Sequence, residues 1–221
     1  EVAEETGVHL DAVNRYLHKR EIPLMLDGIQ QAGSRAAKIV SHMLSFSRMS
    51  NRQLAECQLT GLIEQALEIA GNDFALLDSF DFKAIRIVRD FDPRVDRVPC
   101  IGNELEQVLL NLLKNAAQAI HQKQDRDRPG QIILRTRFHP PWAEIQVEDN
   151  GGGIPEAVRK RIFEPFFTTK EVGQGTGLGL SVSYFIITNN HKGQMEVQSQ
   201  PGQGAIFTLR LPLATAEPAN S

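Results

Sequence analysis

Two asparagines, Asn111 and Asn115, are spaced by four residues in the segment Asn-Leu-Leu-Lys-Asn. On a helix this spacing projects both amides from one face, and Glu104 lies on the same face about two turns earlier. Asn can supply a carbonyl oxygen to Mg²⁺ without adding negative charge that would repel a phosphate-bearing ligand. Such a pair is also common on solvated helix surfaces, so it indicates a metal site only together with other motifs.

A carboxylate is predicted at the end of a strand, where Asp149 begins the run Asp-Asn-Gly-Gly-Gly-Ile-Pro. Ile145 and Val147 share one face of that strand, and Asp149 is in phase with them, so its side chain is expected on the covered side. It would need a hydrogen-bond donor there, and the amino group of adenine is one. Gly151 and Gly153 would let a ligand lie against bare backbone. A structural turn with a solvated Asp is the alternative.

Glycines alternate at Gly175, Gly177 and Gly179, and an apolar helical pattern follows them. Bare N–H groups at every second position can approach phosphates, and the start of the next helix adds its positive end. The spacing differs from the dinucleotide-binding fingerprint, and no Lys-Ser or Lys-Thr pair follows as in a P-loop. We therefore predict a phosphate loop of another kind. A flexible linker is the alternative, weakened because Leu178 and Leu180 would anchor the segment in a core.

Between the two glycine segments, Phe163 begins the run Phe-Glu-Pro-Phe-Phe-Thr-Thr-Lys. Its closely spaced phenylalanines indicate a packed anchor, while Thr169 and Lys170 precede glycines that could act as hinges. This arrangement suits a lid that closes over a nucleotide, with Lys170 meeting a phosphate. A lysine taken by itself is more often simply solvated.

Taken in order, four motifs resemble the N, G1, F and G2 boxes of sensor histidine kinases. They are Asn-Leu-Leu-Lys-Asn-Ala, Asp-Asn-Gly-Gly-Gly-Ile-Pro, Phe-Glu-Pro-Phe-Phe-Thr-Thr-Lys and Gly-Thr-Gly-Leu-Gly-Leu. The joint match covers Asn103 to Leu211 and is far more specific than any single glycine motif. The resemblance implies an α+β fold, the Bergerat ATP-binding sandwich, in which helices cover one face of a mixed sheet.

The resemblance also implies roles for individual residues. Asn115 would hold Mg²⁺ with Asn111 beside it, and both asparagines are expected to act with Lys170 in catalysis. Asp149 would accept a hydrogen bond from the adenine amino group, and Thr208 on the last strand would lie near the same base. ATP would be bound by Asn115, Asp149, Gly151, Gly153, Ile154, Phe163, Thr169, Lys170, Gly175, Thr176, Gly177, Leu178, Gly179, Leu180 and Thr208.

The chemistry of that family transfers the γ-phosphoryl group of ATP to a histidine and then to an aspartate of a response regulator. Positioning and charge neutralisation do most of the work in such transfers. None of the six histidines resembles the family's acceptor, in which His is followed by an acidic residue. His9 precedes Leu-Asp, His18 precedes Lys-Arg, and His42 lies inside a predicted helix. We therefore expect the acceptor upstream of Glu1, and a chain that binds Mg-ATP without phosphorylating itself.

The elements that precede these motifs are helical. From Ile22 to Phe46 apolar residues recur with gaps of three and four, which predicts one long amphipathic helix with a heptad seam. It resembles the second helix of the dimerisation and phosphotransfer hairpin of sensor kinases, so a homodimer through that hairpin is expected. The helix argues against a hydrolytic relative such as a mismatch-repair ATPase. A non-catalytic nucleotide-binding module of the same superfamily is the remaining alternative.

The elements that carry the motifs form an α+β pattern. Helices are predicted after Thr60, which can cap one, and from Asn103 to His121. Pro93 and Pro99 indicate a loop. Strands are predicted at residues 85–88, 131–138, 142–149, 194–200 and 205–211.

The length of 221 residues allows one domain and an appendage. We expect a helical region at residues 1–52 that lacks the acceptor helix, an ATP-binding domain at 53–213 and a frayed tail at 214–221. Lys and Arg total 24 against 27 Asp and Glu, a net charge of −3, so no nucleic-acid partner is expected.

Two cysteines without a CxxC pair suggest neither a disulfide framework nor a zinc site. The apolar stretches fall well short of the ~20 residues that a membrane span needs. A cytoplasmic location is therefore expected, and the parent protein's anchoring to a membrane is left open.

Overall fold

The structure is a computed structural model, and it describes residues 5, 7, 9–30, 33, 54–77, 82–123, 128–170 and 176–213. The chain divides into two compact units. One comprises Glu1–Ser50 with Lys170–Thr176, and the other comprises Asn51–Thr169 with Gly177–Ser221. The predicted boundaries at residues 52 and 213 stay predictions, and the predicted tail lies outside the described residues.

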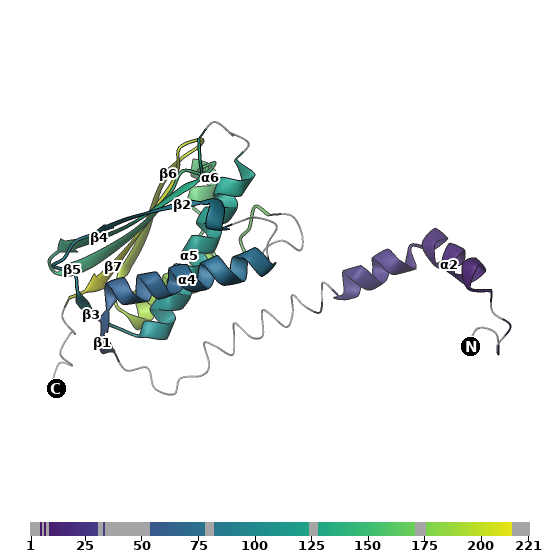
Figure 1. Cartoon of the computed structure of the whole chain (residues 1–221), viewed down its shortest axis with the longest axis horizontal. Coiled ribbons are helices and arrows are strands. Elements are labelled where there is room, and N and C mark those ends of the chain that lie inside the picture. The colour runs from purple at the N-terminus through teal and green to yellow at the C-terminus, as the bar shows by residue number, and fades with distance from the viewer. Residues whose placement is uncertain are drawn as a thin grey trace. The chain divides into compact units, whose positions relative to one another are not determined.

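The first unit contains helix α2, Leu10–Lys19, and a second helical stretch at residues 22–30 (Figure 1). Between them Glu21 has a φ of 55°, which interrupts the helical path. The apolar face of α2 is exposed, and Leu10 is 62% accessible to solvent. Apart from Gly33, which is also helical, the rest of the predicted long helix lies outside the described residues.

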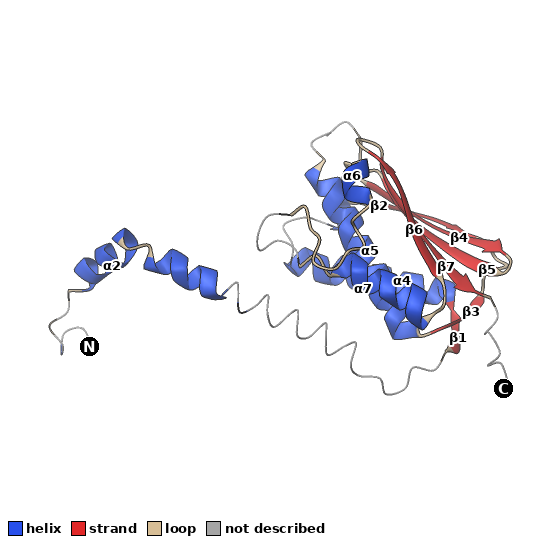
Figure 2. Ribbon diagram, turned by 180° about the vertical axis from the view of Figure 1, so that it is seen from behind, coloured by secondary structure: helices blue, strands red, loops and turns tan. Residues whose placement is uncertain are grey.

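The second unit is built on a five-stranded sheet of order β2-β4-β5-β7-β6, in which β2 runs parallel to β4 and the other neighbours are antiparallel. Helices α4, Leu59–Leu77, and α5, Gly102–Gln122, cover one face of it (Figures 1 and 2). The predicted mixed sheet with helices on one face is thereby confirmed. The strands are β2 Arg86–Phe91, β4 Gln131–His139, β5 Trp142–Asp149, β6 Gln194–Gln200 and β7 Gly204–Pro212.

Alternation along the strands decides which side chains meet the helices. On β5, Ala143, Ile145 and Val147 are buried on the covered face. They face a stripe of α5 with the period of an amphipathic helix, as the sequence predicts. Burying such side chains stabilises the layer by about 25 cal/mol per Å² of apolar surface. The buried residues of α5 are Leu105, Val108, Leu109, Leu112, Leu113, Ala116 and Ala117.

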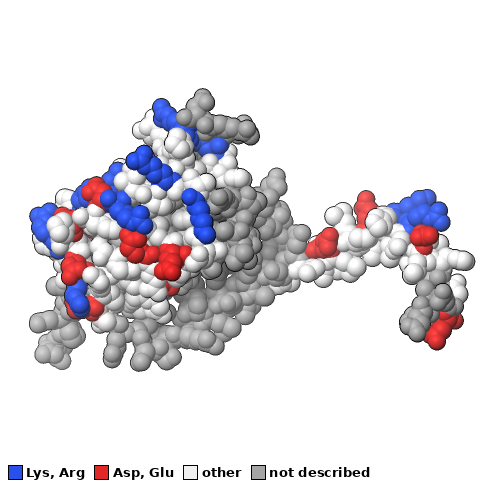
Figure 3. Space-filling view, in the orientation of Figure 1, with Lys and Arg blue, Asp and Glu red and all other residues white. Residues whose placement is uncertain are grey.

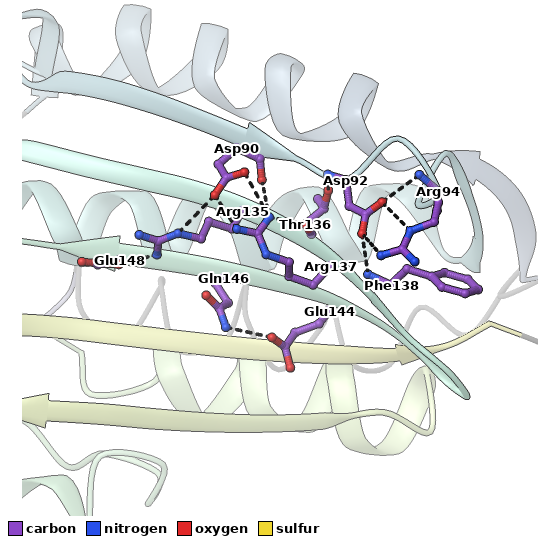
Figure 4. A network of polar contacts seen from close by, with 10 residues as sticks. All are labelled: Asp90, Asp92, Arg94, Arg135, Thr136, Arg137, Phe138, Glu144, Gln146 and Glu148. Atoms are coloured by element: carbon purple, nitrogen blue, oxygen red, sulfur yellow. Dashed lines mark hydrogen bonds and ion pairs between the residues drawn. The ribbon is translucent and has the colours of Figure 1, made fainter.

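The open face of the sheet is polar and carries ion pairs between strands (Figure 4). Arg135 on β4 pairs with Glu148 on β5. Arg210 on β7 places its Nε 3.0 Å from Oε2 of Glu144, and Gln146 donates to the same carboxylate at 2.8 Å. Acidic and basic side chains of the second unit are likewise intermixed on the face seen in Figure 3. These ion pairs are partly buried, and the apolar core of the layer lies on the covered face.

Two short strands differ from the sequence prediction. β1, Ala55–Gln58, and β3, Arg97–Cys100, form an antiparallel two-stranded sheet. Pro99 was predicted in a loop but lies in β3 opposite Glu56. A two-stranded sheet tolerates proline because one edge of each strand needs no N–H donor. Helix α4 follows β1 directly and begins at Leu59, so Thr60 lies inside the helix and does not cap it.

The last helical segment is tied back to the start of α5. Helix α7, Gly179–Phe185, continues into a π-helical turn at Ile186–Asn190. The next residue, His191, is buried; its Nε2 accepts the N–H of Ile101 at 2.9 Å, and its Nδ1 lies 3.0 Å from the carbonyl oxygen of Ile186. These partners require a neutral ring with the proton on Nδ1. His191 is thus structural.

The remaining elements are short. They are a 3-10 turn at Phe82–Ala84 and helix α6, Glu156–Arg159. In the ranges that the structure describes, no helix has both the length and the apolar character needed to cross a membrane.

Candidate functional site

One face of α5 carries a row of three residues spaced by four, Asn111, Asn115 and Ala119. A rise of 1.5 Å per residue separates neighbours in the row by about 6 Å. At one end, a Cβ added to Gly151 would lie 2.7 Å from the carbonyl carbon of Ala119. At the other end, a Cβ added to Gly179 would lie 2.3 Å from Oδ1 of Asn111. The row therefore spans the distance between the two glycine segments, with Asn115 in the middle.

Asp149 closes the end of β5 next to Gly151. It is 5% exposed, on the covered face, and its Oδ1 accepts the N–H of Gly151 at 2.8 Å. Burial raises the pKa of Asp149 to about 6, although hydrogen bonds from the backbone of Gly151 and Ala205 and the charge of Lys123 act to lower it. A buried carboxylate with a raised pKa at the edge of a site is suited to accept a hydrogen bond from a ligand.

Asn150, the next residue, has a structural role. Its Oδ1 accepts the N–H of Gln131 at 2.8 Å, and its Nδ2 donates to the carbonyl of Pro129 at 2.9 Å. These bonds tie the end of β5 to the start of β4. The structural-turn alternative is therefore right for Asn150, whereas Asp149 is buried and not solvated.

The segment after Asp149 packs on the turn between β6 and β7. Gly153 has a φ of 70°, and a Cβ there would lie 2.0 Å from the carbonyl oxygen of Gln200. The N–H of Ile154 donates to Oγ of Ser199 at 2.8 Å, and that hydroxyl donates to the carbonyl of Gly204 at 2.6 Å. Gly153 and Ile154 are thus held at the same end of the sheet as Asp149.

Thr208 lies on the open face of the sheet, opposite to the face that carries Asp149, and its predicted place near the adenine stays a prediction. The register pairs Thr208 with Gln146, whose side chain lies on the open face of the sheet (Figure 4), and pairs Asp149 with Ala205. Because successive side chains alternate, Thr208 points away from the covered face. Ala205 is the β7 residue that lies beside the carboxylate of Asp149. Its position follows from the strand register, which the sequence pattern does not contain.

The second glycine segment contacts the phenylalanine-rich segment. Gly177 has a φ of 65°, and a Cβ there would lie 2.4 Å from the carbonyl carbon of Phe166. Phe163 packs against Tyr184 of α7, with ring centroids 5.0 Å apart. Leu178 is buried and half-buried Leu180 lies in the first turn of α7, so both act as anchors of the segment. The two motifs therefore form one packed region.

Four more residues were predicted to bind ATP. Thr169 is exposed at the end of the phenylalanine-rich segment, and Lys170 and Thr176 cluster with the first unit. Gly175 lies outside the described residues. Their roles in binding ATP stay predictions.

A divalent cation bound through phosphate oxygens would find suitable partners on α5. Asn115 is half-buried, and its side-chain amide makes no hydrogen bond in the part of the chain that the structure describes. Asn111 turns Oδ1 toward Gly179. Within the described ranges, no group of three or more His, Cys, Asp or Glu side chains could hold a metal. Amide oxygens and few charges fit Mg²⁺ that is held mainly by its ligand's phosphates.

Comparison with known proteins identifies the family to which the chain is similar. The profile of the histidine kinase-, DNA gyrase B- and HSP90-like ATPases matches residues 101–215. The signal transduction histidine-protein kinase AtoS of Escherichia coli K12 is 35% identical over 199 residues, which are 89% of this chain and 29% of AtoS. The two-component sensor PprA of Pseudomonas aeruginosa is 38% identical over 186 residues, 81% of this chain and 19% of PprA. The chain spans less than a third of either curated relative.

Solved structures of histidine kinases have the same fold as this chain. The nucleotide-free catalytic domain of the histidine kinase ThkA matches with a TM-score of 0.60 and 28% identity, covering 73% of this chain and 96% of that domain. Full-length ShkA in complex with AMPPNP matches with a TM-score of 0.66 and 25% identity, over 89% of this chain and 40% of ShkA. Because the family profile covers over half of the chain and the fold is that of a kinase catalytic domain, the chain belongs to the histidine kinase-, DNA gyrase B- and HSP90-like ATPases, with sensor histidine kinases among its relatives.

Proposed function

We propose that this chain is the ATP-binding catalytic part of a two-component sensor histidine kinase. The observation that carries the proposal is the row Asn111, Asn115 and Ala119, which joins the two glycine segments and has the buried Asp149 at one end. Three kinds of group thereby lie beside or on helix α5. They are a hydrogen-bond acceptor for a base, an amide for a metal and bare backbone for phosphates.

In the proposed complex each group has one task. Asp149 accepts from the adenine amino group, and the backbone after it leaves room for the base. Asn115 contributes an oxygen to Mg²⁺, and the backbone of Gly177 and Gly179 donates to phosphates. Mg²⁺, when bound, neutralises charge on the transferring phosphoryl group. The protein's own part is to orient ATP, with the base held against the buried Asp149.

The proposed reaction passes the γ-phosphoryl group to a histidine and then to the receiver aspartate of a response regulator. We further propose a homodimer through the helical hairpin and a cytoplasmic location, where ATP and response regulators are found. Support comes from the sensor kinases among the relatives and from the exposed apolar face of α2.

Calorimetric titration with Mg-ADP tests the nucleotide site. We expect saturable 1:1 binding, and Asn115→Ala should weaken it by about tenfold when Mg²⁺ is present, since one metal ligand is lost. Thr188→Val, which removes an exposed hydroxyl from the segment after α7, is the matched control. Absence of binding at millimolar Mg-ADP would contradict the proposal.

Incubation with γ-labelled ATP tests the acceptor. We expect the chain alone to take up no acid-labile, base-stable label, because none of its six histidines resembles the acceptor motif. Label of that kind on the isolated chain would show that one of them accepts phosphate after all.

A further inference from the structure

Ser183 is a buried polar residue at the contact between α7 and α5. It is 2% exposed, and its Oγ accepts a hydrogen bond from Nδ2 of Asn111 at 3.0 Å. Its chain neighbour Val182 is buried as well, so an apolar residue would suit this position for packing alone. Packing alone therefore does not explain the hydroxyl, because a buried hydrogen bond adds little net stability to the fold.

The bond to Ser183 fixes where the Asn111 amide lies, and the other end of the amide faces the phosphate segment. A Cβ added to Gly179 would lie 2.3 Å from Oδ1 but 3.2 Å from Nδ2, so the oxygen is the end nearest to the first turn of α7. A serine hydroxyl can accept from an amide NH₂ or donate to an amide oxygen, so Ser183 fixes the place of the side chain and not the choice of end. In this structure Nδ2 donates to Ser183, and the oxygen is the end that faces the site.

We infer that Ser183 is a positioning residue that holds the Asn111 side chain at the phosphate side of the site. The inference rests on the proposed function, since it concerns the end of the site where Mg²⁺ and phosphates would bind. An amide oxygen attracts a divalent cation or the water bound to it, whereas an NH₂ group in its place repels the cation. Ser183 itself touches no ligand and acts only through Asn111.

Gly179 completes the arrangement from the other side. Any side chain at Gly179 would overlap Oδ1 of Asn111 and push the amide away from Ser183. The three residues Asn111, Gly179 and Ser183 therefore act as one unit, which we call the amide clamp. This unit also explains a glycine at position 179, because α7 has ordinary helical backbone there and needs no positive φ.

The test compares ADP affinity with Mg²⁺ and with EDTA in the whole chain, by calorimetry. Ser183→Ala should raise the Kd for ADP about tenfold in Mg²⁺, since a freed Asn111 side chain can turn away from the cation, and by less than about twofold in EDTA. Thr188→Val should change neither value. Equal losses with and without Mg²⁺, or no loss in either, would overturn the inference.

One further measurement, together with the wild-type titration, keeps the test decisive. In the wild-type chain the side-chain NH₂ of Asn111 should exchange slowly with water, because Ser183 accepts a hydrogen bond from it. Its signal in ¹⁵N spectra is assigned by its loss in Asn111→Ala. Fast exchange would overturn the clamp even if Ser183→Ala does not fold. If the wild-type chain binds no Mg-ADP, the proposed function fails and the inference with it. If the wild type binds and Ser183→Ala binds equally well, only the inference fails.

Discussion

Asp149 shows how burial prepares a single side chain for a ligand. Its pKa is raised from the ordinary 3.8 to about 6, mainly by desolvation, so the folded chain holds a proton at pH values where the unfolded chain has lost it. The stability linked to this group is complete below about pH 3.8 and is lost as the pH rises through 6. At neutral pH the carboxylate is therefore charged in a place that disfavours charge, and a donor from a ligand relieves that cost.

Nucleotide affinity should accordingly depend on pH. We expect the affinity for ADP to fall as the pH drops below 6, because a protonated Asp149 no longer offers both oxygens as acceptors. The ¹³C signal of the Asp149 carboxyl should titrate near pH 6 in the free chain and at lower pH with ADP bound. Asp149→Asn identifies the signal by removing it. An equal pKa in the free and bound chains would contradict the role given to this carboxylate.

The same residue should set the choice of base. Asp149→Asn should reduce the preference for ATP over GTP by about tenfold or more, because an amide replaces part of the acceptor surface. Competition binding of the two nucleotides measures this ratio. The matched control is Glu148→Gln, which removes the same charge one residue away on the open face of the sheet. Unchanged discrimination in Asp149→Asn would exclude the proposed contact.

At the scale of elements, α5 is the structural centre of the second unit. One face of it packs on the sheet, a second carries the row from Asn111 to Ala119, and its start is bound to the end of the last helical segment. The bond from Asn190 to Glu104, at 2.8 Å, joins the same two segments. Movement of α7 would therefore be transmitted to the asparagines that the proposed metal site uses.

His191 should be among the more costly residues to replace. His191→Ala removes the partners of the Ile101 N–H and the Ile186 carbonyl and leaves a cavity, so we expect a loss of about 2–4 kcal/mol in the free energy of unfolding. Urea denaturation measures it. His139→Ala, at an exposed position at the end of β4, should cost less than about 0.5 kcal/mol. Similar values for the two variants would contradict a structural role for His191.

At the scale of the whole molecule, the groups proposed to bind nucleotide belong mainly to one unit. Asp149, Asn111, Asn115 and Gly177 all lie in the unit that spans Asn51–Thr169 and Gly177–Ser221. The ThkA match supports the independence of this unit, because it covers nearly all of a catalytic domain solved by itself. Residues 1–50 would then not be needed for nucleotide binding.

Truncation tests this division. A chain of residues 54–213 should bind Mg-ADP with a Kd within about twofold of the full chain, since no group of the helical region 1–50 is assigned to the site. Calorimetry on both chains gives the comparison, and circular dichroism shows whether the short chain is folded. A folded short chain that binds ten times more weakly would place part of the site in the helical region.

The sequence by itself determined the local features. Alternation predicted β4 and β5 almost to the residue, the helical period predicted α5, and the spacing of Asn111 and Asn115 predicted a shared face. The phase of Asp149 with Val147 predicted its burial. These features could be predicted because they depend on periodicity within one segment, where neighbours along the chain are also neighbours in space.

Only the tertiary structure decided which distant residues meet. Strand register placed Ala205 beside Asp149, and a shift of one residue would have placed Gly204 or Ile206 there. The pairing of β1 with β3 and the bond between Ser183 and Asn111 join segments far apart in the chain. Neither leaves a periodic signal, because long-range contacts depend on how whole layers pack and not on the spacing of residues within any one of them.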